Sequence, residues 1–323
     1  MSVLVSVNCV TYNHEKYIRD AIEGVLKQVT DFDFEFLIGE DCSTDSTRKI
    51  VEEYVLKYPE KIRMITSEKN VGHRLNNIRL HDESIGKYVA ICEGDDYWVD
   101  PYKLQKQVDY LENNPECTFS FHNAYTVNAR KEKIEEKNSL IKKNNPFFTR
   151  TNNYDAGEVT LLGVVPTSSF IYRKELLDNP PDWYYTAVVR DMSVKFIATY
   201  YGYAHYFNES MGVYRVGVKD SLTDKWRQDR RKKEIQIELN KGFIQLLDNF
   251  NHYSGNKFKE NIDKSKIPFE IMILSLEENK DEIKNEKYKD YLDKLGVKEK
   301  VVYYARINFP KPFAFFARMK ASR

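Results

Sequence analysis

The sequence lacks the features that define several large classes of protein. Its 323 residues contain only four cysteines, Cys9, Cys42, Cys92 and Cys117, and none belongs to a Cys-x-x-Cys pair. We therefore expect reduced thiols in a cytoplasmic protein. No uncharged apolar run approaches the roughly 18 residues of a spanning helix. The first residues have no basic stretch followed by an apolar one, so no secretory signal is predicted.

The sequence also has little net charge and no glycine-rich nucleotide-binding motif. The formal net charge is only +1, so no global field favours nucleic acid, and we expect no nucleic-acid partner. The sequence contains neither a P-loop nor a Gly-x-Gly-x-x-Gly motif. What remains is a composition of 41% hydrophobic and 31% charged residues, which is typical of a soluble globular protein.

Strand-like and helical patterns alternate along the first third of the chain. Strands are predicted at 3–10, 34–38, 62–66 and 88–92. Helices are predicted after the candidate caps Asn13 and Ser43 or Thr44, ending near residues 26 and 58, and again at 74–85 and 101–114. Repeated β-α-β units with short links predict an α/β fold, in which helices cover both faces of a mostly parallel sheet.

The rhythm then changes. Residues 118–127 alternate like a half-buried strand, and 157–174 are apolar and β-like around a proline. A helix is predicted at 191–201, ended by Gly202, and another strand follows at 203–217. From about Trp226 the pattern is mainly helical, which predicts a separate helical region.

Polar clusters follow three of the predicted strands. They are Thr11-Tyr12-Asn13, then Glu40 to Asp45, and then Glu93 to Asp96. Because ligands bind outside the carboxyl ends of parallel strands, we expect the clusters to converge on one crevice. For single residues such as Asn13, helix capping is an equally good interpretation.

Capping explains the third cluster poorly. Glu93, Asp95 and Asp96 place three carboxylates within four positions, and one cap needs only one of them. A divalent cation resolves the repulsion, because Mg²⁺ and Mn²⁺ prefer oxygen ligands and Mg²⁺ binds one or two carboxylates together with substrate phosphates. The cluster therefore predicts an open metal site that suits a diphosphate.

These motifs together resemble a known enzyme family. The segments "VNCVTYNHEKYIRDAIEGVLKQ", "GEDCSTDST", "NVG" and "GKYVAICEGDDYWVDPYKLQKQV" are similar to the family 2 glycosyltransferases of GT-A fold. The resemblance extends from about Val3 to Arg215. It implies a Rossmann-like GT-A domain at 1–223, with a nucleotide-binding half at 1–117 and an acceptor half at 118–223.

The resemblance also implies roles for the strand-end residues. Thr11 and Asn13 match positions that line the nucleotide pocket, and Glu40 and Asp41 match an acidic pair that reads the base and ribose. Asp96 matches a metal ligand, whereas Asp95 lies beside the ribose or the ion and is the second candidate ligand. The implied cofactor is a divalent metal, Mn²⁺ or Mg²⁺.

The downstream motifs imply the sugar and acceptor contacts. "VPTSSFIYRK" resembles the loop beneath the donor sugar, which makes Thr167 and Ser168 candidate sugar contacts. Asp191 matches the catalytic base, which takes the acceptor hydroxyl proton during inversion; helix capping is the alternative for it. Arg215 or Lys219 would meet phosphate charge. The Gln-x-x-Arg-Trp motif of processive synthases is missing, which favours transfer of a single sugar.

The functional prediction is thus an inverting enzyme that moves a sugar from a nucleotide diphosphate, a UDP-sugar, to a glycan or lipid-linked oligosaccharide hydroxyl in surface polysaccharide biosynthesis. Two other classes compete with it. A non-catalytic nucleotide-sugar-binding scaffold would not need Asp95, Asp96 and Asp191 together. A sugar nucleotidyltransferase would need a Gly-rich basic loop after the first strand, where the sequence has "TYNHEKY".

The region 224–323 carries no recognisable chemistry. Packing on the rest of the chain, or a homodimer interface, is the simpler interpretation. The alternative concerns its basic, aromatic end, which could dock at an anionic surface on the inner face of the cell membrane and bring the enzyme to a lipid-linked acceptor.

Overall fold

The structure, a computed structural model, describes residues 3–131, 133–135, 152–163, 165–219, 221 and 233–308. The chain forms two compact units, one of residues 1–185 and 190–220, and one of residues 186–189 and 221–323. Three expectations lie outside the described residues: the domain boundary after 223, most of the charged segment 128–145, and the basic end from 309 onward.

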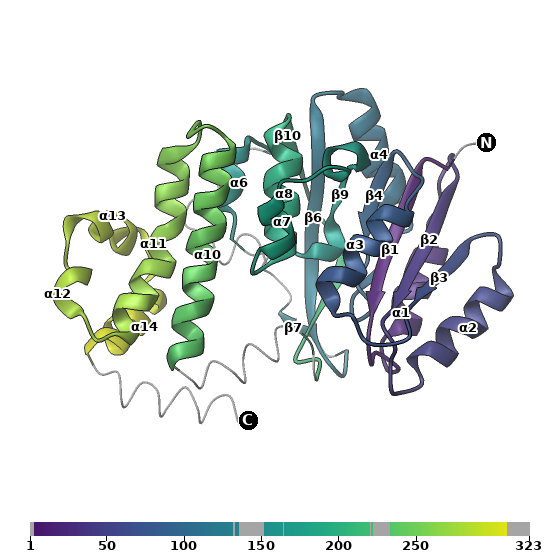
Figure 1. Cartoon of the computed structure of the whole chain (residues 1–323), viewed down its shortest axis with the longest axis horizontal. Helices are drawn as coiled ribbons and strands as arrows, with labels where there is room; N and C mark the ends of the chain where they lie inside the picture. The colour runs from purple at the N-terminus through teal and green to yellow at the C-terminus, as the bar shows by residue number, and fades with distance from the viewer. Residues whose placement is uncertain are drawn as a thin grey trace. The chain divides into compact units, whose positions relative to one another are not determined.

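The first unit is built on one mixed, mostly parallel sheet (Figure 1), which confirms the predicted α/β fold. Its strands follow the order β3-β2-β1-β4-β9-β6-β10-β5, with β7 paired to β6 and β8 paired to β10. The strands are β1 (Val5–Thr11), β2 (Phe34–Glu40), β3 (Ile62–Thr66), β4 (Tyr88–Ile91), β5 (Tyr97–Trp98), β6 (Cys117–Asn128), β7 (Lys133–Glu135), β8 (Asn153–Tyr154), β9 (Ile171–Arg173) and β10 (Tyr203–Val216). The β1, β2, β3 and β4 strands run parallel, whereas β9 is antiparallel to both of its neighbours.

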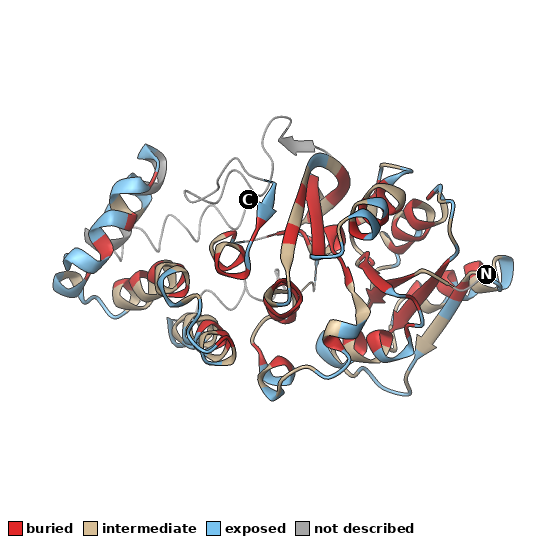
Figure 2. Ribbon diagram, turned by 90° about the horizontal axis from the view of Figure 1, so that it is seen from above, coloured by how far each residue is buried: buried red, intermediate tan, exposed pale blue. Residues whose placement is uncertain are grey.

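Successive side chains of a strand point to opposite faces of the sheet, and helices cover both faces. The helices of this unit are α1 (Ile18–Leu26), α2 (Thr47–Lys57), α3 (His73–Glu83), α4 (Lys103–Asn113), α6 (Ala156–Leu161) and α8 (Arg190–Tyr200), with α7 (Asp182–Thr186) at its edge. Phe36 and Ile38 pack in the cluster that contains α1, α2 and α4, whereas Leu37 between them packs with Leu80 of α3. Figure 2 shows the resulting buried sheet.

Two sequence predictions were wrong in the second half of this unit. Residues 157–161 lie in α6, not in a strand, because Asp155 and Glu158 form a reciprocal capping box that starts a helix there. The β6 strand is buried on both faces from Cys117 to Ala124, because β9 and β10 pair with its two edges and α4 and α8 pack against it. Its short polar side chains had suggested a half-exposed strand.

The second unit is helical, as predicted. It contains α10 (Lys233–Tyr253), α11 (Lys259–Leu276), α12 (Lys280–Ile283), α13 (Glu286–Lys294) and α14 (Val297–Asn308). The rings of Phe243 and Phe269 stack at 4.8 Å between α10 and α11. The α11 helix begins eight residues before the predicted apolar segment at 267–276 and runs through Pro268. None of the described helices is both long and apolar enough to cross a membrane.

Candidate functional site

The loops after β1 and β2 are tied to each other by side-chain hydrogen bonds. The Asn13 backbone N–H donates to Ser43 Oγ at 3.0 Å, and Asn13 Oδ1 accepts from the Thr44 N–H at 2.8 Å. Thr47 and Asp45 accept further backbone N–H groups from the β1 loop. Asn13 therefore does not cap the helix that follows it, and the first two polar clusters form one surface at the strand ends.

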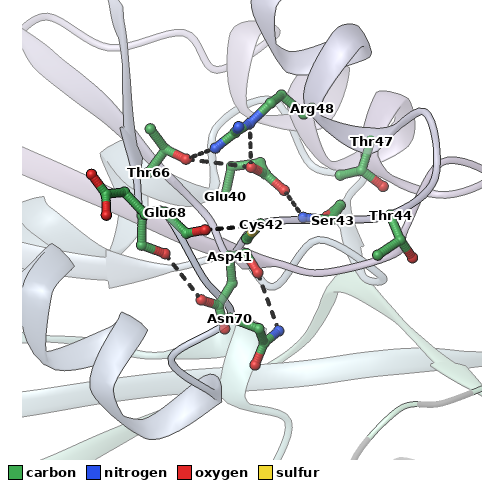
Figure 3. A network of polar contacts seen from close by, with 12 residues as sticks. Glu40, Asp41, Cys42, Ser43, Thr44, Thr47, Arg48, Thr66, Glu68 and Asn70 are labelled. Carbon is green, nitrogen blue, oxygen red and sulfur yellow. Dashed lines mark hydrogen bonds and ion pairs between the residues drawn. The ribbon is translucent and has the colours of Figure 1, made fainter.

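Glu40 braces this surface from below. Its side chain is buried, with Oε1 accepting from the Ser43 N–H at 2.6 Å and Oε2 accepting from Arg48 Nε at 2.8 Å. Arg48 also donates to Thr66 Oγ1 at the end of β3 (Figure 3). A buried charge needs such partners, so Glu40 shapes the loop from beneath.

Asp41 organises the neighbouring loop. Its two carboxylate oxygens accept from the backbone N–H groups of Val71 and Gly72 at 2.7 and 2.8 Å, and Asn70 Nδ2 donates to its carbonyl (Figure 3). These bonds fix the segment "NVG" at the entrance to α3. Oδ1 also lies 3.5 Å from Ser67 Oγ, so Oδ2 is the Asp41 oxygen with a lone pair left for a further donor.

Cys42, between this acidic pair and Ser43, adopts a left-handed backbone conformation with φ of 58°. A side chain with a Cβ atom is strained there by about 1–2 kcal/mol, whereas glycine is not. We expect Cys42→Gly to raise the free energy of unfolding by roughly 0.5–1 kcal/mol, measured by urea denaturation. Cys42→Ala is the matched control, because it removes the thiol but keeps the Cβ atom. An equal gain in both variants would show that the thiol is responsible.

The end of β4 presses against the β1 loop. A Cβ atom on Gly94 would lie 2.8 Å from Thr11 Oγ1 and 2.9 Å from His14 Nδ1, so only glycine fits between these residues. Glu93 Oε1 lies 3.2 Å from His73 Nε2 on α3. The three polar clusters therefore meet at one edge of the sheet, as the parallel topology predicts.

Asp96 has a different environment from its neighbour Asp95. The Asp96 side chain is buried, with the residue only 1% exposed, and its oxygens accept from the Arg215 N–H at 2.8 Å and from Ser168 Oγ at 2.9 Å. Asp95 is partly exposed, and no hydrogen bond or ion pair joins its carboxylate to another residue in the described ranges. Of the two, Asp95 presents the more accessible oxygens.

Arg215 is enclosed by the protein. Its side chain is 0% exposed, pairs with Asp20 at 2.9 Å and donates to the Asp95 carbonyl. The guanidinium lies over the rings of Tyr17 and Tyr97, with its Cζ atom 4.8 and 5.1 Å from the ring centroids. Its charge is thus paired with Asp20, and its position fixes the backbone that carries Asp95.

Asp191 lies beside the same cluster. Thr167 Oγ1 donates to Asp191 Oδ2 at 3.3 Å, and Thr167 adjoins Ser168 in the short 3₁₀ helix η1 (Thr167–Ser169). The preceding residue, Arg190, donates from Nη1 to Asn77 of α3 at 3.2 Å and anchors the start of α8. The structure therefore brings Asp191 and the end of β4 together through η1.

The carboxylates at the end of β4 lie close enough to influence one another. Burial, reinforced by the charges of Asp95 and Glu93, raises the pKa of Asp96 well above its usual range. Within the described ranges, no group of three or more His, Cys, Asp or Glu side chains could hold a metal by itself. The residues instead fit an open site, in which Asp95 would supply one or two oxygens and a substrate phosphate would supply the others.

The sequence analysis missed three residues of the site. Trp98 Nε1 donates to the Ser168 carbonyl at 2.7 Å and so holds η1 in place. His73 faces Glu93, and Asp20 pairs with Arg215 across 195 positions. The buried Trp98 gave a usable signal, because its ring N–H needs a partner, but nothing near Asp20 in the sequence points to Arg215.

Comparisons with known proteins agree with this geometry. Residues 6–179 match the model of the "Glycosyl transferase family 2". An uncharacterised protein of Mycobacterium tuberculosis is 36% identical over 187 residues, which cover 56% of this chain and 52% of the relative. The putative teichuronic acid biosynthesis glycosyltransferase TuaG of Bacillus subtilis is 37% identical over 118 residues, 36% of this chain and 45% of TuaG. The matched region thus spans about half the length of these relatives.

Solved structures share the fold. S. aureus TarS in complex with UDP-GlcNAc aligns with a TM-score of 0.60 at 18% identity, covering 98% of this chain and 88% of the TarS chain. The mannosyltransferase PcManGT from Pyrobaculum calidifontis, in complex with GDP-Man and Mn²⁺, aligns with a TM-score of 0.56 at 13% identity, covering 99% of this chain and 87% of that chain. At these identities the likeness concerns the fold alone.

Proposed function

Because the chain belongs to the glycosyl transferase family 2, we propose that it transfers a single sugar from a nucleotide diphosphate sugar to a hydroxyl group of a glycan or a lipid-linked oligosaccharide, with inversion at the anomeric carbon. The proposed donor is a UDP-sugar, which the UDP-GlcNAc complex of TarS supports by analogy of fold. TuaG supports surface polysaccharide as the product class.

One observation carries this proposal. Hydrogen bonds connect Asp96 to Ser168, and Thr167 to Asp191, so the acids at the end of β4 and the acid at the start of α8 border one site although they are almost a hundred residues apart. A displacement reaction needs both parts: a group that neutralises the departing diphosphate and a base for the incoming hydroxyl.

In the proposed reaction, Asp191 accepts the proton of the acceptor hydroxyl while that oxygen attacks the anomeric carbon and the bond to the diphosphate breaks. Asp191 Oδ2 accepts from Thr167, and Oδ1 accepts from the Met192 N–H at 2.7 Å. These bonds orient the Asp191 carboxylate.

The end of β4 would face the diphosphate. Asp95, with Glu93 beside it, would hold a divalent metal, and the bound metal would neutralise the charge that develops on the leaving group. The manganese complex of PcManGT supports a metal of this kind. Two neighbours would hold Asp95 in position. Asp96 accepts from Ser168 of η1 and from the Arg215 N–H, and the Arg215 side chain donates to the Asp95 carbonyl.

Donor binding and turnover test this proposal. We expect one class of nucleotide sugar, tested as UDP-, GDP- and dTDP-sugars, to raise the melting temperature in the presence of Mn²⁺. A ligand at about 100 times its Kd stabilises the folded state by about 2.7 kcal/mol. The same donor should be hydrolysed slowly with Mn²⁺, and EDTA should abolish the release of nucleotide.

The negative results are equally informative. Binding of a nucleotide sugar without turnover on any acceptor, and without hydrolysis, would favour a non-catalytic binding protein. Turnover that EDTA leaves unchanged would contradict the proposed metal. Production of a nucleotide sugar from a nucleoside triphosphate and a sugar phosphate would instead identify a nucleotidyltransferase.

A further inference from the structure

The α14 helix of the second unit presents an apolar face to solvent. Val297 is 80% exposed, Val301 is 61% exposed and Tyr304 is 64% exposed. These residues are four and three positions apart, and at 100° per residue they fall within one narrow sector of the helix. We call this sector the α14 face. An aligned set of exposed apolar residues is unusual on a soluble helix.

The α14 helix is attached through a different side. Tyr303 packs edge-to-face against Tyr291 of α13, with the ring centroids 6.5 Å apart. Tyr303 lies more than 90° around the helix from each residue of the α14 face. The α14 face is therefore not the side that packs on α13.

Charge is distributed unevenly along the chain at this point. Six of the 50 Lys and Arg residues lie in 300–323, and none of the 49 Asp and Glu residues does. The rest of the chain therefore has a formal net charge of −5, although the whole chain has +1. The basic residues are Lys300, Arg306, Lys311, Arg318, Lys320 and Arg323.

Aromatic residues accompany this charge. Residues 309–323 lie outside the described residues, and their sequence, "FPKPFAFFARMKASR", adds four phenylalanines among the basic residues. The helix with the α14 face leads directly into this segment. Basic residues alternating with aromatic ones, next to an exposed apolar helix face, match what an anionic bilayer surface binds.

We propose that the α14 face docks on an anionic phospholipid bilayer, whose charge is opposite to that of the basic sequence from 300 to 323. Val297 and Val301 insert among the lipid chains at the interface. This docking goes beyond the proposed reaction and does not depend on it.

A second copy of the chain is expected to bind the α14 face less well than a bilayer does. Two α14 faces in contact would bring two basic segments of six cations each close together, and like charges repel. A bilayer of anionic lipid supplies the opposite charge instead, at about 1 kcal/mol for each basic residue near the surface, or about a fivefold gain in binding.

Vesicle flotation with the full chain tests the docking. We expect binding to vesicles of phosphatidylglycerol and phosphatidylcholine, little binding to phosphatidylcholine alone, and release by high salt. The double variant Val297→Ser, Val301→Ser should lower the partition coefficient roughly thirtyfold. Arg306→Gln with Lys311→Gln should lower it about twenty-fivefold at low salt.

The chain offers a matched control for the apolar variant. Leu56 on α2 is 83% exposed, so Leu56→Ser removes an exposed apolar side chain of the first unit and should leave vesicle binding unchanged. Val297, Val301 and Leu56 are all exposed, so these serine substitutions should not change the circular dichroism spectrum. Metal-stimulated hydrolysis of a soluble donor should also stay unchanged, which separates this proposal from the proposed reaction.

Three results would overturn the docking proposal. The first is equal binding of the wild-type protein to neutral and anionic vesicles. The second is full vesicle binding by the Val297→Ser, Val301→Ser variant. The third is a concentration-dependent dimer of the wild-type protein that this variant abolishes, because the α14 face would then be an interface between two copies.

Discussion

Asp191→Asn is expected to lower kcat about a thousandfold, within the range of 10²–10⁴ that a general base contributes, and to leave the donor Kd unchanged. The amide oxygen of Asn can still accept from the Met192 N–H, and its NH2 group can donate to Thr167 Oγ1 in place of the present bond, so the loop geometry should survive. The Asn side chain cannot take a proton from the acceptor hydroxyl. Initial rates of sugar transfer, with donor binding measured separately by calorimetry, will show the effect.

A helix-capping role for Asp191 makes a different prediction. Asn caps helices about as well as Asp, so a residue that only caps α8 would lose almost no activity in Asp191→Asn. Asp155→Asn supplies the comparison, because Asp155 caps α6 through the Glu158 N–H at 2.8 Å and has no proposed role in the chemistry. Comparable kcat values for the wild type, Asp155→Asn and Asp191→Asn would rule out the base.

Asp95→Asn is expected to lose activity alone, whereas Asp96→Asn is expected to lose both activity and stability. Asp95→Asn should lower metal-stimulated transfer by roughly a hundredfold, since a bound metal contributes several kcal/mol of charge stabilisation. Its unfolding free energy should stay close to the wild-type value, because the Asp95 carboxylate has no hydrogen-bond partner in the described ranges. The Mn²⁺ concentration needed for half-maximal activity should rise.

Asp96→Asn should lower both activity and stability. Oδ1 of Asn can still accept from the Arg215 N–H, but Nδ2 would replace the oxygen that accepts from Ser168, so this buried hydroxyl would lose its acceptor. We expect a loss of about 1–3 kcal/mol in the free energy of unfolding, measured by urea denaturation. If instead Asp95→Asn unfolds more easily and Asp96→Asn only weakens the response to Mn²⁺, the roles of the two acids are exchanged.

Local sequence carried enough information to predict the arrangement of the first unit. Apolar strands with short links predicted a parallel sheet, and with it the meeting of Thr11, Asn13 and the acids after β2 and β4; the strand order itself was not predicted. The same reasoning predicted Asp191 at the start of a helix, and α8 begins one residue earlier. These features depend on residues within one β-α unit or on the general topology of such sheets.

The environment of each acid was not predictable in this way. Asp96 and Arg215 are 119 positions apart, and only the pairing of β10 with β5 and β6 brings the Arg215 N–H to the carboxylate. For the same reason the sequence ranked Asp96 above Asp95 as a metal ligand, whereas burial makes Asp95 the more accessible of the two. Arg215 looked available for phosphate until its contact with Asp20 was visible.

The hydrogen bonds of Asp96 also determine when this residue can reach its native position during synthesis of the chain. Chains emerge from the ribosome at about 5–20 residues per second, and the amino-terminal parts form first. The pairing of β1 to β4 with one another and the bonds between the loops after β1 and β2 involve no residue beyond 94, but Asp96 obtains its two donors only when Ser168 and Arg215 have been made. The pairing of β1 to β4 can therefore begin on the nascent chain several seconds before Asp96 acquires its final position.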